Sequence, residues 1–279
     1  MKKALLASAA VAALTIATPT LAADLPARMP VKALPVVAPV PIFSWTGCYL
    51  GGHVGGGWGH KEFSDPTDAV FAPPGEVVRV NTSGFLGGGQ IGCDWQFAPN
   101  WVIGIEGAAS WADIKGDTFV PVTPGTLHAK TDFLASATGR VGWTWDRWML
   151  FAKSGAAWDH DKYDFTGQTL LPCFGEPGGL LDCVTKVKAV PTAFDFAASE
   201  TRTGWTVGAG VEWAFWNNWS AKLEYDFYEF GRRRLTFVDS TGNFPGLAVP
   251  VDIDQRIHTV KFGINYRFAW GKAPVVAKY

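Results

Sequence analysis

The sequence predicts an all-β chain that closes into an eight-stranded antiparallel up-and-down β-barrel crossing a membrane. Three observations lead to this fold class. An export signal opens the chain, and no later apolar run is long enough for a spanning helix of about 20 residues. Apolar and polar residues then alternate along eight segments. The connections between these segments are alternately short and long, as expected when the two ends of each strand lie on opposite sides of a membrane.

The N-terminal region divides into two parts. A basic start and an apolar run, closed by small residues, indicate a signal peptide at residues 1–22. Residues 23–44 contain five prolines and no strand or helix period, so we predict an extended periplasmic linker, either a plain spacer or a docking segment. The barrel should span residues 45–268, with a C-terminal tail at 269–279.

The composition suits a membrane barrel better than a soluble enzyme. The 279 residues include 32 glycines and 14 tryptophans, and only 18% of them are charged. Abundant glycine and tryptophan are typical of barrels with aromatic girdles. The formal net charge of −1 becomes −3 when the two positive charges of Lys2 and Lys3 leave with the signal peptide, which argues against a nucleic-acid partner.

The last predicted strand, Ile257 to Phe268, shows the period-two pattern most clearly. Its outward face would carry His258, Val260, Phe262, Ile264, Tyr266 and Phe268, and its inward face Thr259, Lys261, Gly263, Asn265 and Arg267. The same division predicts seven earlier strands, at Trp45–Gly59, Ser83–Phe97, Trp101–Ile114, Asp132–Trp145, Trp148–Tyr163, Thr203–Phe215 and Trp219–Phe230. Strands of about 12 to 15 residues, tilted near 40°, cross a hydrophobic band about 25 Å tall.

The connections and the tryptophans orient these strands. Tight turns are predicted at residues 98–100, 146–147 and 216–218, and long loops at residues 60–82, 115–131, 164–202 and 231–254. Outer-membrane barrels have short periplasmic turns, so both termini should lie in the periplasm. Tryptophans then form a periplasmic girdle of Trp95, Trp101, Trp145, Trp148, Trp213 and Trp219, and an outer girdle of Trp58, Trp111, Trp158 and Trp205.

The predicted inward faces carry charges of both signs. The acids are Asp94, Glu106, Glu212, Glu224 and Asp226, and the bases are Arg140, Lys153, Lys222, Lys261 and Arg267. An eight-stranded barrel is only wide enough for side chains to fill it, so we expect these charges to pair across the interior and plug it. A narrow gated ion path is the alternative function for the same residues.

The four cysteines of an exported chain permit two disulfides with three connectivities. Spacing favours two local bridges. Cys173 and Cys183 enclose a segment rich in proline and glycine, which they would staple as a loop, while Cys48 and Cys93 lie on predicted paired strands near the same end. A zinc site is disfavoured because neither pair has the close C-x-x-C spacing.

No catalytic residue and no cofactor are predicted. The histidines (His53, His60, His128, His160 and His258) show no evident serine partner at a strand end. Two rim segments could instead bind ligands. Residues 158–164 offer carboxylates and imidazole to a divalent cation or to lipopolysaccharide, or form a solvated strand end. Arg232, Arg233 and Arg234 could grip lipid A phosphates, or form a solvated loop.

Four stretches carry a family resemblance. The mature start ADLPAR, the strand WTGCYLGGHVGGGWG, the segment GFLGGGQIGCDWQF and the ending HTVKFGINYRF resemble outer-membrane immunogenic proteins of alphaproteobacteria, within the opacity-porin-like β-barrel family. The resemblance implies an outer-membrane barrel of eight strands, surface antigenicity and a contribution to envelope integrity. It also implies that Phe262, Ile264, Tyr266 and Phe268 form the signal for the barrel-assembly machinery. Here the chain continues past Phe268 to Tyr279, so either residue could close that signal.

The leading functional prediction is a structural, surface-exposed barrel with a filled interior. Its expected partners are outer-membrane lipid, lipopolysaccharide and the assembly machinery. The alternatives are an adhesin that binds an external ligand through its outer loops, including the loop between Cys173 and Cys183, and a narrow porin for small solutes.

Overall fold

A computed structural model of the chain describes residues 43–64, 77–121, 123–171, 190–243 and 247–268. The predicted signal peptide, nearly all of the linker, the C-terminal tail and the Cys173–Cys183 loop lie outside the described residues. Within the described part, no helix is long and apolar enough to cross a membrane.

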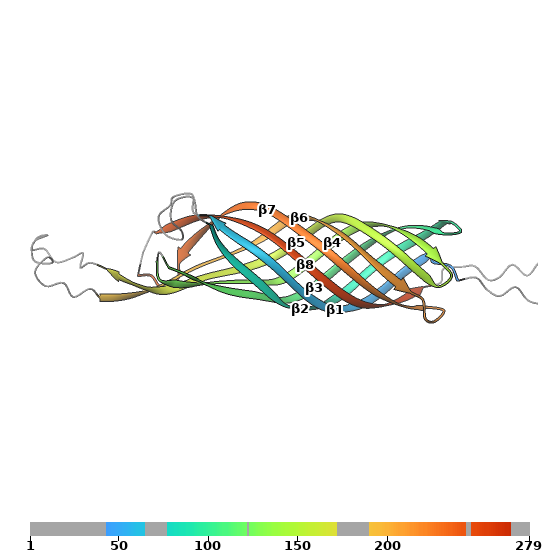
Figure 1. Cartoon of the computed structure of the whole chain (residues 1–279), viewed down its shortest axis with the longest axis horizontal. Coiled ribbons are helices and arrows are strands. Elements are labelled where there is room, and N and C mark those ends of the chain that lie inside the picture. Colours follow the sequence, from blue (N-terminus) through green and yellow to red (C-terminus); the bar gives the residue numbers. More distant parts are fainter. Residues whose placement is uncertain (1–42, 65–76, 122, 172–189, 244–246, 269–279) are drawn as a thin grey trace, which may run out of the picture. The chain divides into compact units, whose positions relative to one another are not determined.

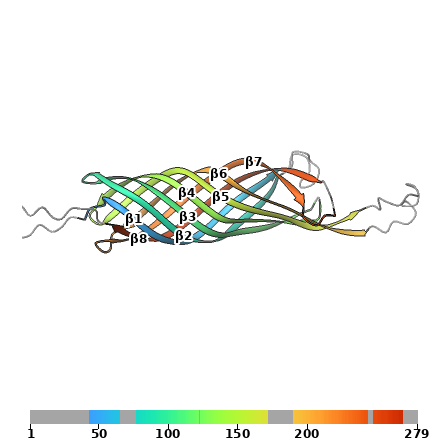
Figure 2. The same cartoon turned by 180° about the vertical axis from the view of Figure 1, so that it is seen from behind.

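Eight antiparallel strands form a closed barrel, which confirms the predicted fold class. The strands follow chain order around the ring, and β1 also pairs with β8 (Figures 1 and 2). Their bounds are β1 Gly47–Ser64, β2 Val77–Ala98, β3 Trp101–Val120, β4 Gly125–Trp145, β5 Trp148–Leu171, β6 Val190–Trp213, β7 Trp219–Asp239 and β8 Ala248–Phe268.

Alternation in the sequence produces the two faces of the wall. Along β8 every second side chain is buried in the interior, from Val249 to Arg267, and the residues between them face outward. Successive residues of a strand point to opposite faces, so one period-two pattern supplies both a filled lumen and a lipid-facing surface.

The strands are longer than predicted. They contain 18 to 24 residues, and most of the segments predicted as long loops are strand. The prediction used the thickness of a membrane, which limits only the part of a strand that crosses it. Beyond that level the alternation continues, with Phe63, Val251 and Ile253 buried in an apolar cluster inside the barrel. In Figure 1 the far ends of β5 and β6 project beyond the other strands.

Aromatic side chains mark two levels on the outside of the barrel. At the end with the short turns, Trp148 stacks on Trp145 and on Trp213. At the other level, Trp58 stacks on His258 with ring centroids 5.9 Å apart. Indole rings prefer the boundary between hydrocarbon and headgroups, so we take these levels as the two edges of the lipid-crossing part of the wall.

One seam of the wall is open beyond the outer level. β6 and β7 pair from Trp213 to Trp205, but their pairing resumes only at Ala197. On β7 this gap contains Gly231, whose φ of 65° is a left-handed conformation that favours glycine. The strands remain attached to β5 and β8, so the gap affects a single seam.

The barrel interior as candidate functional site

All ten charged residues predicted to face inward lie inside the barrel, and each is at most 5% exposed. They come from β2, β3, β4, β5, β6, β7 and β8. Charges at such depth are costly unless they are paired and hydrogen-bonded. The arrangement of their partners therefore decides what the interior can do.

Four of these residues form a group near the short turns. Arg267 donates from Nη1 to Asp94 Oδ2 over 2.7 Å and pairs from Nη2 with Glu212 Oε1 over 3.0 Å. Arg140 forms a two-pronged ion pair with the same Asp94 and also reaches Glu212 Oε2 at 3.3 Å. Each carboxylate is thus shared by two guanidinium groups from different strands.

The other six residues form a second group deeper in the barrel. Glu106 accepts from Lys222 at 2.8 Å and from Lys153 at 3.2 Å. Lys261 lies 2.6 Å from Asp226 and 3.1 Å from Glu224. Because the two groups together contain five acids and five bases, the buried charge is balanced.

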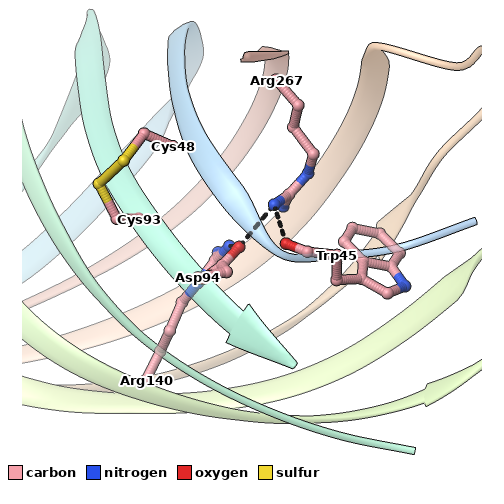
Figure 3. The surroundings of a disulfide bond; sticks show 6 residues. All are labelled: Trp45, Cys48, Cys93, Asp94, Arg140 and Arg267. Carbon is pink, nitrogen blue, oxygen red and sulfur yellow. Dashed lines mark hydrogen bonds and ion pairs between the residues drawn. A yellow bond between two sulfur atoms is a disulfide. The ribbon is translucent and has the colours of Figure 1, made fainter. Parts of the chain in front are cut away.

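An aromatic plug covers the first group. Trp45, which the sequence analysis placed in a strand, precedes β1 and is fully buried. Its ring lies 4.7 Å from the Arg267 guanidinium, and its carbonyl accepts a hydrogen bond from Arg267 (Figure 3). Arg140 lies 4.7 Å from the Tyr49 ring. Such cation–π contacts favour a desolvated guanidinium.

A histidine inside the barrel does have a serine partner. His53 Nε2 lies 2.7 Å from Ser110 Oγ, and His53 Nδ1 contacts the amide oxygen of Gln90. The prediction from the sequence considered serine partners only at strand ends, and this pair lies within β1 and β3. The third member of the set is the amide of Gln90 rather than a carboxylate, and His53 and Ser110 are both buried.

A further polar cluster was missed by the sequence analysis. Lys61 lies 2.7 Å from Asp161, whose carboxylate also accepts from Thr131 and Tyr163. Gln255 donates to Asp159 over 2.6 Å. Both aspartates are fully buried and therefore cannot bind a cation at the rim, whereas Lys162 and Asp164 of the same segment are exposed. Alternation along β5 turns the two aspartates inward.

Arg202 belongs to the same cluster and lies beside the open seam. It pairs with Glu200 on its own strand, and its Nη1 donates to the carbonyl of Ile253 on β8 over 3.0 Å. β6 and β8 are not neighbours in the ring, so this hydrogen bond ties together the strands on either side of β7. Arg202 is fully buried, as expected for a side chain that fills the gap from inside.

Apolar layers separate and cover the polar ones. One apolar layer lies between the ten paired charges and the cluster around Lys61 and Asp161. It consists of Leu86, Ala112, Ile114, Leu134, Ala157, Tyr228, Phe230 and Ile257. The outer one includes Phe63, Val80, Leu127, Phe165, Phe194, Phe237 and Val251. Polar and apolar layers therefore alternate along the interior of the described part of the barrel.

Cys48 and Cys93 form a disulfide between β1 and β2. Both cysteines share the outward face with their strand neighbours Leu50 and Ile91, so the bridge lies on the lipid-facing side of the wall, away from the interior charges (Figure 3). Cys48 also lies opposite Phe268 of β8. The four residues proposed as the assembly signal, Phe262, Ile264, Tyr266 and Phe268, face outward along β8.

The arginine triplet lies on β7 and not in a loop. Arg234 forms a two-pronged ion pair with Asp252 at 2.7 and 3.0 Å, and this pairing lowers the pKa of Asp252. Arg232 lies opposite Asp254, and Arg233 opposite the inward-facing Ile253. The structure therefore divides the triplet among three environments.

Among the described residues, no group of three or more His, Cys, Asp or Glu is arranged to hold a metal ion. The interior is instead occupied by paired charges, with aromatic rings at two levels outside. Together with the closed eight-stranded ring, these features define the class of outer-membrane β-barrel proteins.

The outer membrane protein beta-barrel domain model matches residues 37–268, and the chain belongs to that family. It is 30% identical over 275 residues to the 31 kDa outer-membrane immunogenic protein of Brucella melitensis, covering 96% of this chain and all of that protein (100%). It is 28% identical to the 22 kDa outer membrane protein of Rhizobium leguminosarum, with 83% and 82% coverage. The crystal structure of OprG from Pseudomonas aeruginosa aligns over 82% of this chain and 100% of OprG, at 9% identity and a TM-score of 0.43. The family model and the two relatives confirm the predicted family and the predicted location in the outer membrane.

Proposed function

We propose that the protein is a non-catalytic structural barrel that stabilises the outer membrane and presents antigenic surface outside the cell. One observation carries the proposal: side chains fill the interior in layers. From the short turns outward these are the apolar cluster around Trp45, the ten paired charges, the apolar layer around Ile257, the polar cluster around Lys61 and Asp161, and the outer apolar cluster. A lumen filled in this way supports a structural role over solute transport. The relatives named outer-membrane immunogenic proteins support the surface role.

Envelope integrity is tested in cells that lack the protein. We expect higher sensitivity to detergent and to large antibiotics that an intact outer membrane excludes, and we expect the full-length protein to restore resistance. A matched complementation uses Asp94→Ala, which removes one of the two carboxylates that Arg140 and Arg267 share and should restore resistance poorly. Unchanged sensitivity of the deletion strain would remove the structural role.

An adhesin is the second candidate function. It is favoured by the extension of β5 and β6 beyond the other strands, which places surface far from the membrane (Figure 1). Attachment of deletion cells to host cells or matrix separates the two candidates. Lost attachment with intact detergent resistance would favour the adhesin, and the reverse would favour the structural barrel.

A further inference from the structure

A groove of about 690 Å³ lies on the outside of the barrel, where β2, β1, β8 and β7 pass the outer aromatic level. We call it the rim groove. Its floor is aromatic, because Trp58 stacks on His258 and Phe227 packs on the other side of the same imidazole with ring centroids 5.1 Å apart. Tyr225 fixes that imidazole through a contact of 2.7 Å. An aromatic floor at this level should lie where acyl chains meet headgroups.

Two rows of polar side chains stand above the floor. The strand register places Asn81, His60, Arg256 and Glu229 side by side in the first row, and Arg79, Glu62, Asp254 and Arg232 in the second. The rows therefore combine three guanidinium groups with three carboxylates. A simple anion would be attracted by the three guanidinium groups and repelled by the three carboxylates. A ligand that carries both phosphates and hydroxyl donors would match both kinds of group.

The guanidinium groups stand farther out than the carboxylates. The side chains of Arg79 and Arg256 are 68% and 55% exposed, against 42% for Glu62 and 22% for Asp254. The hydrogen bond from Arg79, with the nearby charge of Arg256, lowers the pKa of Glu62, so this acid stays ionised within the row.

The arginines also keep donors to spare. With the residues that the structure describes, Arg79 uses only Nε in its pair with Glu62, at 2.8 Å, and Arg256 makes only long contacts of 3.6 and 3.8 Å with its two acids. Within the described part of the chain, Arg232 has no ion pair. A guanidinium has five N–H donors, so each of these groups can still bind a phosphate oxygen.

We propose that the rim groove binds the headgroup of a phosphorylated glycolipid of the outer leaflet, such as lipid A. The arginines bind its phosphates, the carboxylates accept from its sugar hydroxyls, and the aromatic floor supports the junction of sugar and acyl chain. None of the arginines 232–234 lines the groove itself, and only Arg232 joins the second row, opposite Asp254, so the site differs from the arginine triplet. The inference goes beyond the structural function and does not depend on a closed interior.

The test measures lipid binding to the purified mature protein in phosphatidylcholine nanodiscs by native mass spectrometry. Lipid A, dephosphorylated lipid A and phosphatidic acid are the three probes. We expect lipid A to bind at least about tenfold more tightly than either of the others, because each lacks one half of the recognised chemistry. Equal binding of lipid A and phosphatidic acid would reduce the groove to a general anionic surface and overturn the proposal, and so would equal binding of the dephosphorylated lipid. This comparison of three lipids uses only the unaltered protein, so it does not depend on whether a variant folds.

A second arm uses matched triple variants. Arg79→Gln, Arg232→Gln and Arg256→Gln should together weaken lipid A binding by at least about tenfold. The control removes three ion-paired cations from the other side of the rim, through Lys115→Gln, Lys130→Gln and Lys162→Gln. It should change binding less than about twofold. Equal losses of lipid A binding in the two triple variants would contradict a specific binding site in the rim groove.

Heat-modifiable migration on gels checks that each variant is folded, and conductance measurements test the closed interior separately.

Discussion

Arg267 of the last strand donates to Asp94 of the second strand over 2.7 Å, inside the barrel and close to the point where the ring closes. The two strands are not neighbours, since β1 lies between them. This ion pair therefore exists only after β8 has paired with β1. It links closure of the ring to burial of its charges.

Removal of Asp94 should be strongly destabilising. Asp94→Ala leaves Arg140 and Arg267 buried with one shared acceptor fewer, and breaking such a pair costs about 3–5 kcal/mol. Urea unfolding in lipid vesicles measures the loss. The matched control is Asp113→Ala, whose partners Lys115 and Lys130 are exposed, and it should cost less than about 1 kcal/mol. Similar losses for both variants would contradict the buried network.

The disulfide should stabilise the barrel chiefly through the unfolded chain. Cys48 and Cys93 are 45 residues apart, and loops of this size correspond to about 2–4 kcal/mol. Cys48→Ser combined with Cys93→Ser should lower the free energy of unfolding by that amount. Comparing this variant with and without reductant isolates any effect of Cys173 and Cys183. A variant as stable as the oxidised parent would exclude this role.

Arg202 should hold the open seam locally. Arg202→Met removes the hydrogen bond to Ile253, so amide exchange should accelerate at residues 198–204 and 230–237, while the lipid-crossing parts of the strands stay protected. Thr201→Ala, a change at the outward-facing neighbour, is the control and should leave exchange unchanged. Uniform acceleration over the whole barrel would mean that Arg202 supports global stability instead.

The assembly signal is predicted to end at Phe268. This residue closes the ring opposite Cys48 and faces outward. Deletion of residues 269–279 should leave a heat-modifiable barrel in the outer membrane, whereas Phe268→Ala with the tail intact should reduce assembly. Mislocalised protein after the deletion would place the signal at Tyr279.

Much of the fold followed from the sequence because one rule governs it. Period-two alternation specified eight strands and the inward position of Lys261 and Arg267, and the short turns fixed their pairing order. Interior charge could be predicted because a charged residue on the inward face of a narrow barrel has no solvent to reach.

The missed features arose where the membrane no longer limits the strand. The inward positions of Lys61, Asp159 and Asp161 obey the same alternation. The first predicted strand ended at Gly59, before Lys61, whereas Asp159 and Asp161 lay near the outer end of their predicted strand, where a rim ligand site or a solvated strand end was expected. The contact of Arg202 with Ile253 joins strands that are not neighbours, and no local pattern encodes it. The burial of Trp45 depends on Arg267, which is 222 residues away in the sequence.

The central claim is that the interior is closed by its own side chains, and conductance in planar lipid bilayers tests it most directly. The purified mature protein should produce no stable open channels, in bilayers where a 16-stranded porin gives large conductance steps. Long-lived channels that pass ions, or passage of small sugars into vesicles that contain the protein, would contradict a filled interior and favour the narrow porin.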